Sequence, residues 1–279
     1  NEQQKVVSQQ PQQPSKSEEL AFKTFELTLP SGGVLYPEDH PVRQSNGVVE
    51  IRQMTAKDED ILNNRQLLKN RSSVDTLLQR CIVNPKGLNI NSLVLGDKSL
   101  ITVVLRINSL GEDYQVNLSC PKCGELAKNE TYNLSTVRIV RVNEDKVAEE
   151  VGINQFKITL PMTKKDIVLR ILTGEDEKEI DSFSENIRRQ KLDNLSETEF
   201  RLMKQIVKVN GSEDPGKIKE LINVMPVGDS KYIKKIYDKI SPDVEMIEKD
   251  WLCPNPSCGE VSDVSVPVGT GFFWPELVG

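Results

Sequence analysis

Four short blocks of this 279-residue chain occur twice in the same order, and this repetition constrains the fold more than any other feature. Residues 25–30 match 156–161, 51–55 match 169–173, 96–97 match 228–229, and 120–125 match 253–260. The offsets are 131, 118, 132 and 133 residues, so the differences in length are confined to two insertions. The pattern predicts an internal duplication. The alternative is that the matching blocks are short turn signals that arose independently in the two halves.

The repetition predicts an α+β fold made of two similar halves. We expect a first α+β repeat over residues 21–145 and a second over 146–279, each carrying one cysteine pair. Residues 1–20 form a Gln/Pro-rich N-terminal arm with six glutamines among its first 19 residues. Such a segment buries too little apolar surface to fold alone. It is either a disordered tail or an arm that becomes ordered along a partner.

Local patterns within each half indicate the elements. Apolar and polar residues alternate over 25–29 and 156–160, which is the period of a strand. Thr55 and Thr173 each precede an acidic residue by three positions, as helix N-caps do. Residues 100–107 are rich in β-branched side chains and could form a strand, but their counterpart near 232–240 has helical spacing. We therefore expect helices over both 97–108 and 229–240.

The cysteines supply the clearest chemical signal. Cys120 and Cys123 form one knuckle-like pair, and Cys253 and Cys258 form the other, each with Gly after its second cysteine. Four thiolates suit a tetrahedral Zn²⁺ that has no open position, which indicates a structural metal and not a catalytic one. Each half supplies only two ligands, so the pattern predicts one shared zinc that joins the halves about a pseudo-twofold axis. Metal-free reduced thiols and disulfides are the alternatives.

Other features argue against catalysis. The fifth cysteine, Cys81, lies on an apolar helical face and is expected in the core, while the single histidine, His40, is expected in an exposed loop. The chain contains no phosphate-binding glycine loop, nucleophile elbow or metalloprotease motif. It has 36 Lys and Arg against 42 Asp and Glu, and this net charge of −6 does not favour a nucleic-acid groove. No stretch is apolar for long enough to span a membrane.

The C-terminal segment concentrates aromatic side chains. Phe272, Phe273 and Trp274 are three of the 14 aromatic residues in the chain. They either fold back on the core or form an anchor for a partner protein, since aromatic residues are enriched at interfaces. The partner-binding hypothesis rests on these three residues.

Several of these motifs together carry a resemblance to a known family. They are Leu-Pro-Ser-Gly-Gly followed by Tyr36-Pro37, the Met54-Thr55 block, an aliphatic helix with Arg106, the two cysteine pairs, and a terminal Gly-Phe-Phe-Trp-Pro. Over roughly residues 20–279 the chain resembles the T4-type bacteriophage baseplate family, whose T4 member is a hub protein of the contractile tail. The resemblance implies a non-enzymatic structural or assembly role, with other baseplate and tail proteins as partners. It also implies synthesis in the host cytoplasm and a place in the tail baseplate of the virion, with no nucleic acid or membrane involved.

Two other function classes remain open at this stage. A zinc-ribbon protein that binds nucleic acid or acts in transcription would need a basic surface beside the knuckles. The charges there are mixed, which counts against it; the residues are Lys122, Glu125, Lys128, Glu130, Glu260 and Asp263. An enzyme stabilised by zinc is the third class.

Overall fold

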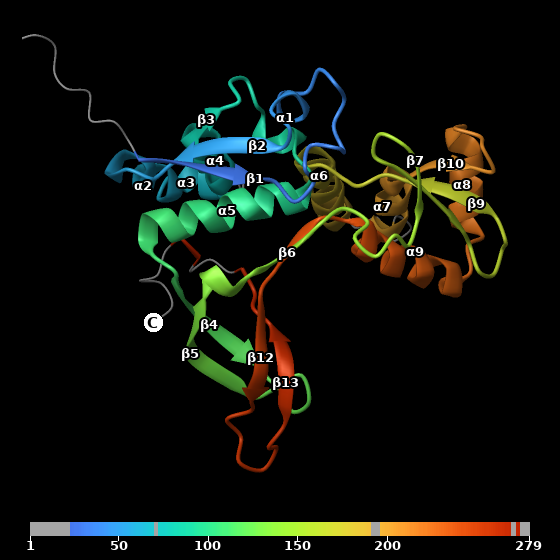
Figure 1. Cartoon of the computed structure of the whole chain (residues 1–279). Helices are drawn as coiled ribbons and strands as arrows, with labels where there is room; N and C mark the ends of the chain where they lie inside the picture. The colour runs from blue at the N-terminus through green and yellow to red at the C-terminus, as the bar shows by residue number, and fades with distance from the viewer. Residues whose placement is uncertain (1–22, 70–71, 191–195, 269–271, 274–279) are drawn as a thin grey trace, which may run out of the picture.

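The computed structural model describes residues 23–69, 72–190, 196–268 and 272–273, which form two α+β bodies and a pair of projecting β-hairpins (Figure 1). The N-terminal arm predicted over residues 1–20 lies outside the described residues. Helices and small antiparallel sheets alternate along the chain, so the α+β fold class is confirmed. Most of the buried hydrophobic side chains of both bodies and the hairpins form one continuous cluster.

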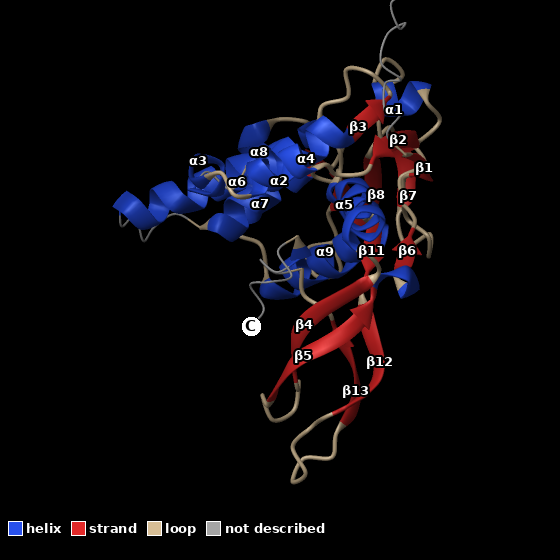
Figure 2. Cartoon of the chain, turned by 90° about the vertical axis from the view of Figure 1, so that its left-hand side faces the viewer, coloured by secondary structure: helices blue, strands red, loops and turns tan. Residues whose placement is uncertain are grey.

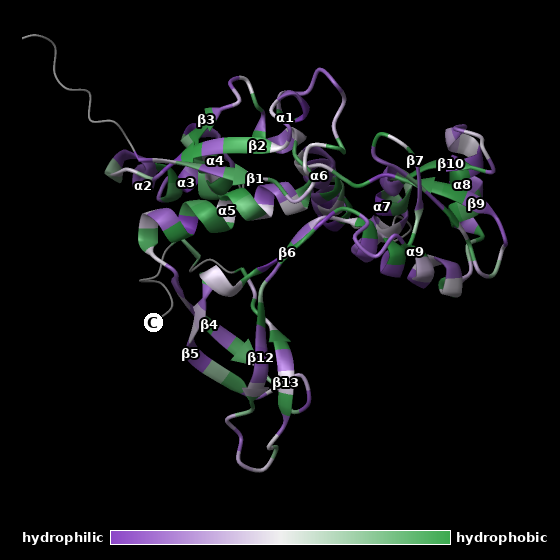
Figure 3. Cartoon of the chain, viewed as in Figure 1, coloured by the Kyte–Doolittle hydropathy of each residue, from purple (hydrophilic) through white to green (hydrophobic). Residues whose placement is uncertain are grey.

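The first body is built on the three-stranded antiparallel sheet β1-β2-β3, against which the helices pack. The alternation seen in the sequence places Leu27 and Leu29 inside, and both are buried. The long helix α5 is mostly hydrophobic along its middle (Figure 3). The elements are β1 (Thr24–Thr28), α1 (Pro41–Gln44), β2 (Val48–Arg52), α2 (Ala56–Leu62), α3 (Arg65–Lys69), α4 (Ser73–Cys81), β3 (Ile82–Asn84), the 3-10 turn η1 (Ile90–Ser92) and α5 (Leu95–Leu110).

The second body has a similar succession of strands and helices, with one additional edge strand, two helices in place of α2, α3 and α4, and no counterpart of α1. Its sheet has the order β10-β9-β8-β7, and β8, β9 and β10 follow one another as β1, β2 and β3 do. The predicted helices over 97–108 and 229–240 are confirmed by α5 and α9. The elements are β7 (Glu149–Gly152), β8 (Gln155–Thr159), β9 (Asp166–Leu169), α6 (Gly174–Gln190), α7 (Glu197–Gln205), β10 (Ile206–Val209), α8 (Pro215–Asn223) and α9 (Val227–Ile240).

Two hairpins project from the bodies side by side, as Figures 1 and 2 both show. One is β4 (Asp113–Ser119) with β5 (Leu126–Asn133), and the other is β12 (Ile247–Leu252) with β13 (Val261–Ser265). At their base, β6 (Arg138–Val140) pairs with β11 (Asp243–Glu245), and the 3-10 turn η2 (Leu134–Thr136) precedes β6. This strand pair ties the segment after the first hairpin to the segment before the second.

A buried aspartate anchors the start of α5 to the turn that follows β1, and another anchors the start of α9 to the turn that follows β8. Asp97 accepts hydrogen bonds from Ser31 N at 2.8 Å and from Ser31 Oγ and Tyr36 OH at 2.5 Å each. Asp229 accepts them from Met162 N at 2.8 Å, Thr163 N at 3.0 Å and Thr163 Oγ1 at 2.8 Å. The repeated Gly-Asp block therefore has the same local role in both bodies.

The glycines of that block offer a matched pair of substitutions. A Cβ on Gly96 would lie 2.0 Å from the backbone oxygen of Pro242, whereas one on Gly228 would meet the Met162 Sδ at 2.5 Å. Backbone cannot move aside as a flexible thioether can. We expect Gly96→Ala to lower the free energy of unfolding by about 1–3 kcal/mol or more, and Gly228→Ala to change it by less than about 1 kcal/mol. Chemical denaturation measures both changes in the free energy of unfolding. Equal losses in the two variants would contradict the close approach of Gly96 to the Pro242 backbone.

Candidate metal centre

Each cysteine pair sits in a tight turn at the tip of a hairpin. Cys120 N donates to Glu125 O at 2.8 Å, and Cys253 N donates to Glu260 O at 2.9 Å, so both turns close in the same way. Gly124 and Gly259, which follow the second cysteines, have φ of +76° and +59°. This left-handed conformation favours glycine. The glycines noted in the sequence therefore let each turn bring its two thiols to one side.

The two turns bring the four predicted cysteines together. Cys120 Sγ lies 4.0 Å from Cys258 Sγ, and Cys123 Sγ lies 3.6 Å from Cys253 Sγ. All four sulfur atoms lie within 4.8 Å of one another. Tetrahedral Zn²⁺ with bonds of about 2.3 Å places sulfurs about 3.8 Å apart. The spacing and the donor set therefore fit such an ion, and each of these two pairs combines one cysteine from each hairpin.

The surroundings of the cluster act on the protonation of its thiols. The Cys123 and Lys122 backbone N–H groups, which donate to the Cys120 sulfur, lower the pKa of that thiol to about 7. Desolvation by burial raises the pKa of Cys253. Beside the sulfurs, Lys122 Nζ of one turn lies 2.6 Å from Glu260 Oε2 of the other. A divalent ion could replace the thiol protons at this place, because metal ligation requires thiolates.

Arg106 supports the base of the hairpins. Its side chain is 2 % exposed. Arg106 Nε donates to Phe272 O at 2.7 Å, and its two terminal nitrogens donate to Gly111 O at 2.6 Å and Asp113 O at 2.9 Å. One guanidinium thus holds the end of α5, the start of the first hairpin and the C-terminal segment together. The sequence pointed to Arg106 only through the family resemblance.

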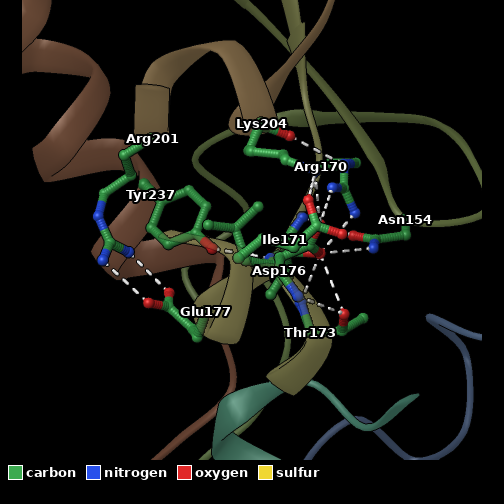
Figure 4. Close-up of polar contacts among 11 residues, drawn as sticks. Asn154, Arg170, Ile171, Thr173, Asp176, Glu177, Arg201, Lys204 and Tyr237 are labelled. Atoms are coloured by element: carbon green, nitrogen blue, oxygen red, sulfur yellow. Dashed lines mark hydrogen bonds and ion pairs between the residues drawn. The ribbon is translucent and has the colours of Figure 1, made fainter. Parts of the chain in front are cut away.

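Figure 4 shows a second polar cluster, at the start of α6. The Arg170 guanidinium donates to both Asp176 oxygens, at 2.9 and 2.5 Å, and Thr173 N donates to the same carboxylate at 3.0 Å. Around it, Asn154 exchanges two hydrogen bonds with the Ile171 backbone, and Arg201 makes a two-pronged ion pair with Glu177. Lys204 O accepts from Arg170 Nε at 2.9 Å, and Tyr237 OH accepts from Leu172 N at 2.8 Å.

The first body contains the same arrangement at the start of α2. Arg52 donates to Asp58 at 2.6 and 3.1 Å, and Thr55 N donates to Asp58 at 2.8 Å. The sequence indicated the threonine caps but not the arginines, because each arginine meets its aspartate only across the turn from strand to helix. The arginine and aspartate side chains are paired in both clusters, and Asp58 also lies 3.2 Å from Arg80 Nε, which indicates a structural role.

The Asp58 cluster gives the fold a defined acid sensitivity. Burial alone would raise the pKa of Asp58, but hydrogen bonds from Arg52 and Thr55 outweigh it and hold that pKa at about 2. A depressed carboxyl pKa stabilises the fold at pH values above the unfolded-state pKa near 4. We expect about 2 kcal/mol of stability to disappear as the pH falls from 4 to 2. In the Asp58→Asn variant this part of the pH dependence of the free energy of unfolding should be missing. If the variant loses as much stability as the parent between pH 4 and pH 2, the loss does not come from Asp58.

The other residues singled out in the sequence lie as follows. Phe272 and Phe273 are 2 % and 6 % exposed, with Phe272 edge-on to Tyr114, so both rings pack within this chain. Trp274 lies outside the described residues. Cys81 is buried in the core, as expected. The expectation for His40 was wrong: it is half-buried, stacks on Tyr36 and accepts from Val42 N at the start of α1.

Comparisons with known proteins agree with the resemblance noted in the sequence. None of the described helices is long and apolar enough to cross a membrane. No curated protein and no solved structure matches the chain. A family model described as T4 bacteriophage base plate protein matches residues 23–274, which include both bodies and both cysteine turns. Because this match spans most of the sequence, the chain belongs to the T4 bacteriophage base plate protein family.

Proposed function

We propose that this protein is a non-enzymatic structural or assembly component of a contractile phage tail baseplate, at or near its hub, acting through contacts with other baseplate and tail proteins. The observation that carries the proposal is the family match over residues 23–274. The polar clusters agree with it, since Arg52, Arg170 and their aspartates are held in closed hydrogen-bonded sets. The protein would therefore be made in the host cytoplasm and act in the virion tail.

We further propose that Cys120, Cys123, Cys253 and Cys258 hold one structural zinc ion per chain. Four thiolates fill a tetrahedral coordination sphere, so the ion would have no position for a substrate. The distances between sulfur atoms and the glycine turns support this ligand set. Metal analysis of the purified protein should find one equivalent of zinc. Two equivalents, or none in a reduced sample, would overturn the proposal.

The two halves, residues 21–145 and 146–279, are proposed to descend from one duplicated unit. The recurrence of the sheet order supports this, as do the matching arginine–aspartate–threonine clusters and the two buried aspartates at the long helices. Superposition of β1-β2-β3 with β8-β9-β10 should bring α5 onto α9. If α5 and α9 then occupy unrelated positions, the duplication is wrong.

The partner contacts are testable at the two ends of the chain. Because Phe272 and Phe273 are buried, alanine at either position should lower stability as well as any binding. Trp274→Ala is therefore the informative substitution for the predicted 272–274 anchor, and deletion of residues 1–19 tests the arm. We expect each variant to lose co-purification with tail proteins of its phage while it retains the parental melting temperature.

A buried position provides the control for that experiment. Phe273→Ala should lower the melting temperature, so its loss of binding would report unfolding instead of a missing contact. If Trp274→Ala and the arm deletion assemble like the parent, the ends are not the partner surfaces. If the intact chain co-purifies with none of its tail proteins, the baseplate role itself fails.

A further inference from the structure

One edge of the first body's sheet is open where the matching edge of the second body is covered. The strands β1 and β8 are equivalent, because residues 25–30 and 156–161 match at an offset of 131. β8 is paired on both sides, with β9 and with the edge strand β7, whereas β1 pairs with β2 alone among the described residues. Figure 2 shows β1 as the outermost strand of its sheet. An open edge of this kind presents unpaired backbone groups to a further strand.

The exposure of the side chains follows this difference between the two strands. The fourth residue is buried and the fifth is exposed in both β1 and β8. Each of the first three residues is more exposed in β1 than in β8; they are Thr24, Phe25 and Glu26 against Gln155, Phe156 and Lys157. β7 pairs with residues 155–157 of β8. The cover given by β7 therefore accounts for the burial that β1 lacks.

The backbone of β1 is arranged to accept a strand at this edge. Lys23 O accepts from Gln53 N at 3.3 Å, and Leu29 N donates to Gly47 O at 2.8 Å, both on the side of β2. Backbone groups of successive residues alternate between the two sides of a strand in an antiparallel ladder. The even-numbered residues of β1 therefore direct their N–H and C=O groups to the open edge; they are Thr24, Glu26 and Thr28.

The turn that brings β7 back onto β8 has no counterpart before β1. Ile153 and Asn154 form this turn, and Asn154 has φ of +50°, a conformation in which asparagine is enriched. The Asn154 side chain accepts from Ile171 N at 2.8 Å. At the equivalent place in the first body, the Lys23 carbonyl oxygen accepts from Gln53 N and so extends the pairing with β2. The chain at Lys23 thus follows β2 and does not turn toward the open edge.

Charge specifies what the edge accepts. In the second body Glu149 of β7 stands opposite Lys157, which is an opposite-charge pair. The equivalent of Lys157 is Glu26, and Glu26 already stands opposite Glu50 of β2. By the offset of 131, the residue of this chain that corresponds to Glu149 is Glu18, which lies outside the described residues. A glutamate there would be the third acidic residue in one row, and like charges opposite one another destabilise a strand pair. A basic residue suits the place.

We propose that the outer edge of β1 binds an extended segment of another tail protein as an added antiparallel strand, with a lysine or arginine opposite Glu26. The internal pairing of β7 with β8 is the template for this contact. The identity of the partner as a tail protein rests on the function proposed above, whereas the strand-binding edge does not. Backbone hydrogen bonds supply the affinity of such a contact, and the basic side chain supplies its selectivity.

A peptide titration of the full chain, followed by NMR, tests the edge. The probe is a synthetic peptide of residues 147–152, which includes β7, with the change Glu149→Lys; the control peptide keeps Glu149. We expect the amide signals of residues 24–28 to shift, and the lysine peptide to bind about threefold or more tightly than the control, because an opposite-charge pair replaces a like-charge pair. Equal affinities, or shifts only elsewhere in the chain, overturn the proposal.

Two substitutions at Glu26 separate strand addition from simple attraction to an acidic surface. Glu26→Pro removes an N–H group that faces the open edge and leaves the bonds to β2, and proline is tolerated in edge strands for this reason. It should abolish binding of the lysine peptide at an unchanged melting temperature. Glu26→Lys should reverse the preference, so that the Glu149 peptide binds more tightly. A Glu26→Lys chain that keeps the parental preference overturns the proposal, whatever the proline variant does.

Two further measurements identify the occupant. If the lysine peptide binds only after residues 1–21 are deleted, the chain's own segment fills the edge and the proposal is overturned. In co-purification from infected cells, Glu26→Pro should lose one tail protein that the parent retains. A Glu26→Pro chain that retains all of them overturns the proposal. A parent that prefers the lysine peptide but binds no tail protein supports the strand-binding edge and overturns the baseplate role instead.

Discussion

Replacing Cys123 and Cys253 with serine should abolish binding of the proposed zinc ion and cause the largest loss of stability among the substitutions considered for this chain. Each residue is one ligand from a different hairpin, and their sulfurs lie 3.6 Å apart. Structural zinc contributes about 10 kcal/mol or more to the folding of small zinc domains. We expect the hairpins to separate first, with fast amide exchange over β4, β5, β12 and β13, while the sheets of the two bodies remain protected.

The fifth cysteine provides the matched control. Cys81→Ala also removes one thiol but lies in the core of the first body, so it should lower stability by a few kcal/mol at most and leave one zinc bound. Zinc content and hydrogen exchange of both variants are the measurements. If the double serine variant keeps its zinc, or its hairpins keep parental protection, the four-cysteine assignment fails.

The second large effect is expected for Arg106→Ala. The substitution would leave three backbone oxygens without their donor: that of Phe272, which is buried, and those of Gly111 and Asp113, which are partly buried. A loss of about 1–3 kcal/mol or more in the free energy of unfolding is expected, because the buried Phe272 oxygen would be left unpaired. Denaturant titration followed by tryptophan fluorescence measures it, since Trp251 lies on β12.

Arg138 serves as the comparison for Arg106. It makes ion pairs with Glu144 at 3.0 Å and Glu245 at 2.9 Å, but its side chain is largely exposed. Exposed ion pairs contribute about 0–1 kcal/mol. Arg138→Ala should therefore cost at most about 1 kcal/mol. Equal costs for the two arginines would mean that the Arg106 contacts do not hold the hairpin base.

The sequence was sufficient to predict the structure where the local residue pattern and the internal repeat pointed to the same element. Residues 100–107 are β-branched enough for a strand, yet they form α5 because the helix is enclosed by the first body and by β11, and Ile101, Val103 and Leu105 are buried on several faces. Only the comparison with α9 allowed the helix to be predicted. The cysteine cluster was likewise predictable, since its ligands recur at matching places of the repeat.

The features that could not be predicted from the sequence depend on contacts between residues that are far apart in the chain. His40 had only Asp39 and Pro41 as visible neighbours, while its ring partners, Tyr36 and Ser92, are set by the fold. Arg106 reaches Phe272, which is 166 residues away. Nor does a repeat reveal how its copies meet, so the contact of the Gly174 turn with Leu93 was visible only in three dimensions.

The place of the cysteine pairs along the chain has a consequence for the unfolded state. Cys123 and Cys253 are 130 residues apart, and the whole second body lies between them. A metal that joined them would close a loop around that body. Closing a loop of this length by a covalent cross-link removes about 4–5 kcal/mol of chain entropy from the unfolded ensemble. As long as the hairpin tips stayed folded around the metal, it would thus stabilise a sheet and four helices that it never touches, by restricting the chain when the second body alone unfolds.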